Sequence, residues 1–200
     1  MRPHAERHYT VEEYFAIEES SAVRHEFYGG EIFAMAGASL AHNRIVGNVY
    51  AALRARLAAS PCETFSSDLR VRTPGGLYTY PDLLVVCGGV ELSTDDRLDT
   101  VLNPTLIVEV LSDSTSDYDR GGKFALYREL PSLREYLLVE QTTLLVEHYT
   151  NPALTGGGAR AEWPRRQYAD AQTHITLASL GIDLPLAEIY ARVEVGDARS

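Results

Sequence analysis

Apolar residues recur at helical spacing in two segments of the first third of the chain. Thr10 and Glu13 place a hydroxyl and a carboxylate three residues apart, which forms a capping box and predicts a short helix to about residue 20. Ser39 can cap a second, long helix that extends to about residue 59. One face of that second segment is apolar and carries Ile45, Val46, Val49, Tyr50, Leu53 and Leu57.

Alternating residues and turn signals predict strands in the middle of the chain. Residues 105–111 are almost entirely apolar, so we expect a central strand that is covered on both faces. The expected strands are residues 62–72, 80–87 and 105–111, and the expected hairpins are residues 25–35 around Gly29-Gly30 and residues 135–149 around Thr142-Thr143.

The sequence pattern in the last part of the chain predicts a helix, a loop, and then a short strand and a C-terminal helix. The helix is expected to begin at residue 116 or 117 and to end before Pro131. Residues 151–166 are rich in glycine and proline and predict a mobile loop. A strand at residues 174–177 and a helix from about residue 186 follow. Helices that alternate with strands in this order predict a mixed α/β fold.

Length and charge narrow the possible functions. The chain of 200 residues fits a single domain over residues 1–200, and its formal net charge of −10 argues against binding nucleic acid by bulk charge. Residues 39–72 nevertheless carry a local charge of +3, which makes them the candidate surface for phosphate groups. No segment approaches the ~18 apolar residues of a membrane helix, and the N-terminus lacks the features of a secretory signal. We therefore expect a cytoplasmic protein without membrane contact.

The two cysteines do not indicate a metal site or a disulfide scaffold. Cys62 and Cys87 lie 25 positions apart in or beside strand-like segments, and this is not a zinc-ligand spacing. We expect both to be reduced and partly buried thiols.

One carboxylate interrupts the apolar pattern. Glu109 lies inside the apolar strand of residues 105–111, where a lone carboxylate must be paired, protonated or bound to a metal. Asp82 lies at the beginning of the other strongly apolar strand. If the two strands are neighbours, the two carboxylates meet at one end of the sheet. Mg²⁺ needs only one or two carboxylates, because it keeps waters and takes oxygens from phosphate.

Lys123 is the only lysine among 18 basic residues, and it lies in the first turns of the helix after the Glu109 strand. An ammonium near the two carboxylates could orient or deprotonate a water and offset phosphate charge. Each residue also has an ordinary explanation. Asp82 could be a turn residue, Glu109 could pair with a buried arginine, and Lys123 could be exposed and paired with Asp119.

Other polar residues are second-tier candidates. His42, early in the long helix, could be a ligand or a proton carrier, although a core or capping role is the more common one. Glu26 could reach the site from the first hairpin or could pair with Arg24. Asp68 and Arg70 share a strand face and could form a surface pair.

The residues so far resemble a known family. Tyr80-Pro81-Asp82, followed by Ile107-Val108-Glu109-Val110-Leu111, is similar to the PD-(D/E)XK nuclease superfamily. Nearly the whole chain resembles the Uma-two family of predicted restriction endonucleases. The matching segments are residues 10–14, 25–31, 112–115, 118–121, 135–139 and 184–190, together with His42, Lys123-Phe124 and Tyr127.

The resemblance implies a fold, a cofactor and a set of ligands. It implies a restriction-endonuclease-like core in which a mixed central sheet is flanked by helices. It also implies that Asp82 and Glu109 bind Mg²⁺, for which Mn²⁺ can substitute, with the carbonyl of Val110 as a further ligand. The superfamily places its lysine two residues after the glutamate, where this chain has Leu111. The resemblance therefore points to Lys123 as the catalytic lysine.

Three hypotheses follow. The first is a Mg²⁺-dependent endonuclease that hydrolyses DNA with Asp82, Glu109 and Lys123 as catalytic residues. The second is a non-catalytic nucleic-acid-binding or scaffold domain on a decayed nuclease fold, and the third is a hydrolase of another phosphorylated substrate. A homodimer would suit cleavage of both strands of a duplex.

Overall fold

The computed structural model describes residues 7–35, 37–112, 115–157 and 162–196, and its centre is a mixed six-stranded sheet. The strands lie in the order β11-β10-β9-β8-β6-β3, with β8 and β9 parallel and the other neighbours antiparallel. Their bounds are β3 Cys62–Ser66, β6 Leu83–Cys87, β8 Leu106–Leu111, β9 Glu135–Glu140, β10 Val146–Thr150 and β11 Arg165–Tyr168.

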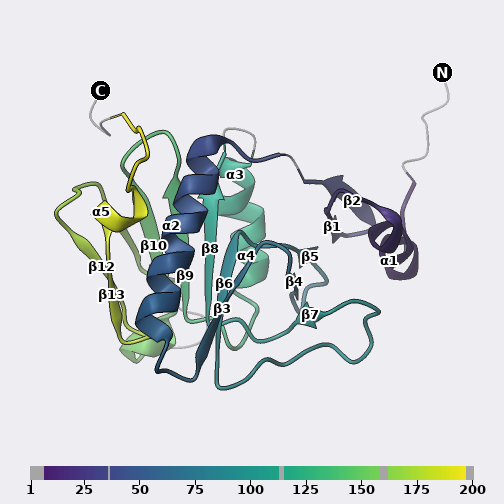
Figure 1. Cartoon of the computed structure of the whole chain (residues 1–200). Helices are drawn as coiled ribbons and strands as arrows, with labels where there is room; N and C mark the ends of the chain where they lie inside the picture. Colours follow the sequence, from purple (N-terminus) through teal and green to yellow (C-terminus); the bar gives the residue numbers. More distant parts are fainter. Residues whose placement is uncertain (1–6, 36, 113–114, 158–161, 197–200) are drawn as a thin grey trace.

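Helices cover both faces of this sheet (Figure 1). The long helix α2 (Leu40–Leu57) packs on one face through the apolar stripe that its sequence predicts. The other face is covered by a continuous helical segment made of α3 (Ser116–Tyr118), the π-helix η1 (Asp119–Lys123) and α4 (Phe124–Tyr127). Successive residues of β6 and β8 alternate between these two cores, so Val108 and Val110 face α2 while Ile107 and Leu111 face α4.

A smaller sheet forms a lobe beside the main body. It contains β1 (His25–Tyr28), β2 (Glu31–Ala34), β4 (Arg70–Arg72), β5 (Tyr78–Thr79) and β7 (Thr100–Val101), in the order β2-β1-β5-β4-β7. Helix α1 (Val11–Ser20) packs its aromatic residues against β1 and β5. The capping box of Thr10 and Glu13 and the hairpin at Gly29-Gly30 are both present, as the sequence predicts.

The C-terminal unit lies against the α2 face. β12 (His174–Leu177) and β13 (Ile182–Pro185) form a hairpin, and the short helix α5 (Leu186–Ile189) follows. The sequence pattern predicts β12 and α5 but not β13. The expected loop at residues 151–166 contains the 3₁₀-helix η2 (Pro152–Thr155) and the beginning of β11, while residues 158–161 lie outside the described part.

The prediction of one strand over residues 62–72 is wrong. A turn at residues 67–69 divides the segment, so β3 joins the large sheet and β4 joins the small one. The predicted surface pair of Asp68 and Arg70 is also absent. Arg70 is buried, and the exposed Asp68 lies 3.7 Å from Arg24 instead.

The cysteines are not free thiols, which corrects the sequence-based expectation. β3 and β6 are antiparallel neighbours whose register places Cys62 directly opposite Cys87, and the two residues form a disulfide. Their Cα atoms are 4.0 Å apart. The sequence could not reveal this pairing. Between β3 and β6 the chain passes through the small sheet, and the number of intervening residues does not tell which residues of the two strands lie opposite each other.

The disulfide is expected to stabilise the fold. Reduction should lower the free energy of unfolding by about 3 kcal/mol, because the cross-link restricts the unfolded chain. Urea unfolding with and without dithiothreitol measures this effect. A Cys62→Ser, Cys87→Ser variant should unfold at the midpoint of the reduced protein under both conditions. An unchanged midpoint on reduction of the native chain would contradict the prediction.

Glu135 fastens the C-terminal hairpin to the main sheet. It is fully buried and accepts hydrogen bonds from the backbone N–H groups of Ala178 and Ser179, at 3.1 Å each, and from the Ser179 hydroxyl. His148 Nε2 lies 3.0 Å from its Oε1. Burial alone would raise the pKa of Glu135, but the hydrogen bonds from His148 and Ser179 outweigh it and lower the pKa.

A carboxyl with a lowered pKa stabilises the fold above its unfolded pKa, and this stability is lost as pH falls through the folded pKa. For Glu135 the loss begins near 4.5, the ordinary glutamate value. We predict that Glu135→Gln costs about 2 kcal/mol at neutral pH and makes stability less dependent on pH in acid. Urea unfolding at neutral pH measures the loss of stability, and urea unfolding at a series of values down through pH 4.5 measures its pH dependence. The exposed Glu63→Gln is the control. Equal acid sensitivity of Glu135→Gln and the native chain would be inconsistent with this role.

Candidate active site

Asp82 lies at the junction between the small sheet and β6. Its Oδ2 accepts a hydrogen bond from the backbone N–H of Val110 at 2.7 Å, and its own N–H donates to Oε2 of Glu109 at 3.3 Å. These contacts arise because β6 and β8 are antiparallel neighbours and Leu83 lies opposite Val108. The two carboxylates that the sequence singled out therefore meet at one end of the sheet.

Glu109 is enclosed by the helical segment on the other side of β8. Its side chain is buried, and its Oε1 accepts hydrogen bonds from the Tyr127 hydroxyl and the Lys123 ammonium, each at 2.8 Å. Burial raises the pKa of Glu109 to about 8, with the nearby charges of Asp119 and Asp82 acting in the same direction and Lys123 opposing them. A bound cation would therefore relieve an unfavourable concentration of negative charge.

Lys123 is at the centre of the cluster. Its Nζ lies 2.8 Å from Glu109, 2.9 Å from Glu26 and 3.6 Å from Asp119. Burial alone would lower its pKa, but the surrounding negative groups, Glu109 first, outweigh burial and hold the pKa of Lys123 well above its ordinary value. Lys123 is therefore a buried, charged group and not the exposed helix residue that was the ordinary alternative.

A π-helical turn positions Lys123. The turn extends over Asp119–Lys123, and such turns are rare and often lie at functional sites. Gly122 allows the ring of Tyr118 to approach closely, because a Cβ at that position would lie 3.3 Å from the ring. Asp119 and Lys123 stand at the two ends of this turn, and Lys123 contacts both Asp119 and Glu109.

The two second-tier residues also reach the cluster. His42 lies in the first turn of α2, which Ser39 caps, and its Nε2 is 3.1 Å from Oδ2 of Asp82. Its Nδ1 is buried and has no hydrogen-bond partner among the described residues. Glu26 contacts Lys123 and accepts a hydrogen bond from the Thr79 hydroxyl at 2.5 Å, so it does not pair with Arg24.

Tyr127 was not predicted as a site residue, and Asp119 was expected only as an ordinary helix partner of Lys123. Tyr127 is fully buried, and its hydroxyl fixes the Glu109 carboxylate. The sequence did hint at Tyr127, because it stands four residues after Lys123 and residues at that spacing share a helix face. The sequence does not show that this face turns toward Glu109, because that depends on how the helix packs on β8.

The donor set fits a divalent cation bound partly by water. Glu26, Glu109 and Asp119 surround one lysine and Asp82 lies beside Glu109, so the cluster carries an excess of negative charge. Within the described residues, no three histidine, cysteine, aspartate or glutamate side chains could hold a metal ion on their own. Mg²⁺ does not need three, because it binds through one or two carboxylates and completes its shell with water and phosphate oxygens.

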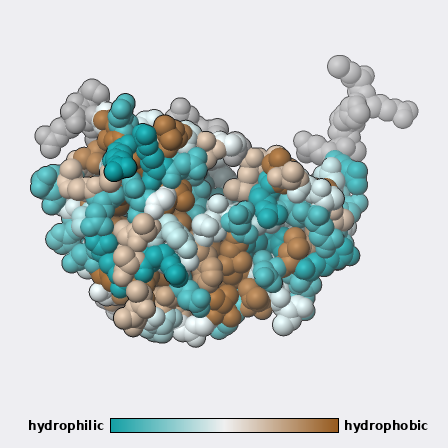
Figure 2. All heavy atoms as spheres, in the orientation of Figure 1, coloured by the Kyte–Doolittle hydropathy of each residue, from teal (hydrophilic) through white to brown (hydrophobic). Residues whose placement is uncertain are grey.

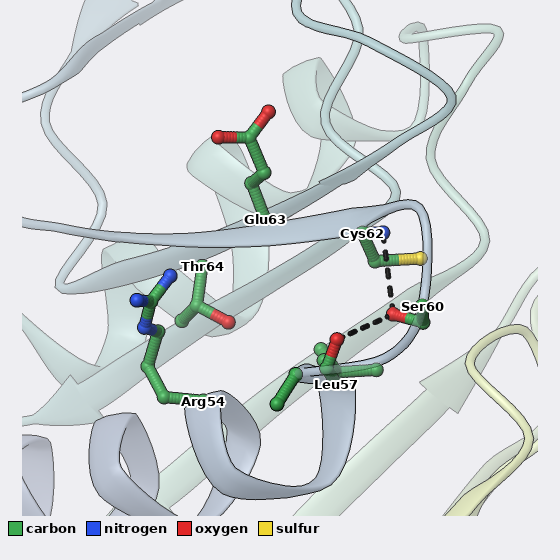
Figure 3. A pocket seen from close by; sticks show the side chains of 7 residues that line it. Arg54, Leu57, Ser60, Cys62, Glu63 and Thr64 are labelled. Atoms are coloured by element: carbon green, nitrogen blue, oxygen red, sulfur yellow. Dashed lines mark hydrogen bonds between the residues drawn. The ribbon is translucent and has the colours of Figure 1, made fainter.

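The surface of the molecule has an indentation (Figure 2) and a hollow. The space-filling view shows the α1–β1–β2 lobe beside the larger body, with an indentation in the outline between them (Figure 2). A separate hollow of about 270 Å³ lies where the end of α2 meets β3, lined by Arg54, Ser60, Cys62 and Thr64 among others (Figure 3). Because no residue of the cluster lines this hollow, it is not part of the candidate site.

None of the described helices is long and apolar enough to cross a membrane.

Comparison with known proteins supports the resemblance seen in the sequence. The Uma2 family, described as "Putative restriction endonuclease", matches residues 11–187. The chain is 40% identical over 141 residues to uncharacterized protein sll1609 of Synechocystis sp., which covers 70% of this chain and 79% of the relative. It is 35% identical over 182 residues to uncharacterized protein slr1290 of the same organism, with 90% of each chain covered.

A solved structure shares the fold. The crystal structure of "a putative nuclease belonging to DUF820" from Anabaena variabilis superposes with a TM-score of 0.67 over 85% of this chain and 91% of that chain. The sequence identity is 14%, so this likeness supports the fold alone. The expected mixed sheet flanked by helices is confirmed. On its sequence match over residues 11–187, this chain belongs to the Uma2 family.

Proposed function

We propose that the protein is a Mg²⁺-dependent endonuclease that hydrolyses phosphodiester bonds in DNA. The observation that supports this proposal most strongly is the contact of Asp82, Glu109 and Lys123 at one end of the central sheet. Membership of the Uma2 family points to the same class of reaction.

In this proposal, Asp82 and Glu109 bind the cation, and the backbone carbonyl of Val110 is a further ligand. Bound Mg²⁺ would polarise the phosphate and make a coordinated water more acidic. The Val110 N–H and His42 hold Asp82 in place, while the Tyr127 hydroxyl holds Glu109. These contacts fix the direction of both carboxylates before substrate binds, which lowers the cost of reorganisation during the reaction.

Lys123 is the proposed catalytic cation. Its ammonium orients the attacking water and stabilises the negative charge that develops on the phosphate. Glu26 and Asp119 hold the ammonium beside Glu109, so they act as positioning residues. The role is electrostatic, because the high pKa of Lys123 keeps its proton in place.

Cleavage of supercoiled plasmid and of labelled oligonucleotides tests the proposal. We expect nicked or linear DNA with Mg²⁺ or Mn²⁺ and none with EDTA. DNA binding without metal-dependent cleavage would instead favour the second hypothesis, a non-catalytic nucleic-acid-binding or scaffold domain. The net charge of −10 and the position of the lysine outside the superfamily pattern are the observations behind that alternative. A homodimer and a cytoplasmic location stay predictions, and light scattering tests the first.

A further inference from the structure

The β1–β2 hairpin has two faces with different surroundings. Phe27 and Ile32 lie opposite each other in the register and pack against α1 in the core of the small lobe. Side chains alternate along a strand, so the neighbours of these residues point to the other face. That second face carries Glu26, Tyr28, Glu31 and Phe33, paired as Glu26 with Phe33 and Tyr28 with Glu31.

This second face belongs to the candidate active site. The Glu26 side chain is only 12% exposed because it reaches Lys123. Phe33, its direct cross-strand partner, is 48% exposed, and Tyr28 is 40% exposed. Two large aromatic rings are therefore presented to solvent beside a residue that contacts the proposed catalytic lysine.

A third aromatic ring lies beside the cluster on the helical segment. Tyr118 directly precedes the π-helical turn and is 38% exposed. Its ring approaches Gly122 closely, and the negative charges that act on its hydroxyl are those of Glu26, Asp119 and Glu109. Exposed aromatic groups thus lie near the cluster on the hairpin and on the helical segment.

Tyr28 and Phe33 are diagonal neighbours on one face of the hairpin. The backbone positions of such neighbours are roughly 7–8 Å apart, which is close enough for two aromatic side chains to contact the same flat ligand. Bases stacked inside a duplex offer only their edges to such a site, whereas an unpaired base offers its faces.

We propose that Tyr28 and Phe33 form a stacking site for an unpaired base beside the scissile phosphate, and that the substrate is single-stranded or locally unpaired nucleic acid. This inference rests on the proposed function and names its substrate class. The charge of the chain supports it. A net charge of −10 and three carboxylates around Lys123 provide little attraction for a phosphate backbone, so we expect the affinity to come from the bases.

Binding measured by fluorescence anisotropy tests the inference without requiring cleavage. The probes are a single-stranded oligonucleotide, a forked duplex and a fully paired duplex, with Ca²⁺ in place of Mg²⁺. We expect the first two to bind more tightly than the paired duplex, and a 2-aminopurine base in the single strand to be quenched on binding. Phe33→Ala and Tyr28→Ala should each weaken single-strand binding roughly 10-fold, the usual loss for one base–aromatic stack.

Two controls make the result specific. Leu154→Ala removes a similarly exposed apolar residue far along the chain and should change nothing, while Phe33→Trp should retain binding. Equal affinity for single-stranded and paired DNA, or unchanged binding by both alanine variants, would overturn the inference. So would a dimer that Phe33→Ala dissociates, because the aromatic face would then be a subunit interface. Base quenching without any metal-dependent cleavage would overturn the proposed function but leave the stacking site in place.

Discussion

Glu109→Gln is expected to reduce cleavage of DNA by about a thousandfold or more while the protein stays folded. The substitution keeps the volume of the side chain and removes the charge that the proposed cation needs. The amide oxygen can still accept the hydrogen bond from Tyr127, and Lys123 keeps Glu26 and Asp119 as partners, so we expect the fold to be retained. Plasmid nicking, quantified over time, measures the rate, and circular dichroism on heating checks the fold.

Two further variants sharpen this result. Lys123→Met should lose activity to a similar extent, and it should also unfold more easily because Glu26 and Glu109 lose their shared partner. Glu63→Gln, an exposed carboxylate on the edge strand β3, is the matched control and should retain full activity. Cleavage that survives in both Glu109→Gln and Lys123→Met would refute the site assignment.

Arg70→Ala is expected to cost about 3–5 kcal/mol of the free energy of unfolding, the largest loss that we predict for a single substitution. Arg70 is 1% exposed, and its guanidinium donates hydrogen bonds to the Thr100 hydroxyl at 2.9 and 3.0 Å and to the carbonyl of Leu98 at 3.1 Å. It also stacks over the Phe15 ring at 4.5 Å. Removal therefore leaves a cavity and unpaired polar groups inside the small lobe.

The same substitution should also disturb the candidate active site. Arg70 contacts the Tyr80 hydroxyl at 3.4 Å, and this hydroxyl donates to buried Glu18 at 2.7 Å. Tyr80 stands two residues before Asp82, so loosening this network displaces a proposed metal ligand. Urea unfolding and plasmid nicking measure the two effects, and Arg70→Met, which fills much of the volume, should recover part of the stability. A loss below about 1 kcal/mol for Arg70→Ala would contradict this account.

Much of the candidate active site is visible in the sequence because it breaks a simple pattern. A carboxylate inside an apolar strand has few stable environments, and this singles out Glu109 from the residue pattern alone. Lys123 is identifiable because it is the only lysine among arginines. Tyr127, Asp119 and the π-helical turn could not be placed in this way, since their roles depend on how one helix packs on the sheet.

The fold is predictable where local signals decide it. The capping box at Thr10, the Gly29-Gly30 hairpin and the apolar stripe of α2 all act within a few residues of the chain. The errors involve contacts between distant segments. The Cys62–Cys87 disulfide depends on strand register, and the burial of Arg70 depends on the division of residues 62–72 between two sheets.

The central claim is that Asp82 and Glu109 bind a divalent cation beside Lys123. Anomalous diffraction from crystals soaked in Mn²⁺ tests it most directly, because manganese replaces magnesium at oxygen sites and can be located without ambiguity. The account predicts one strong anomalous peak within about 2.0–2.3 Å of both carboxylates, which is absent in Asp82→Asn crystals soaked in the same way. A fully soaked crystal with no peak at these carboxylates, or with its peak elsewhere in the chain, would contradict it.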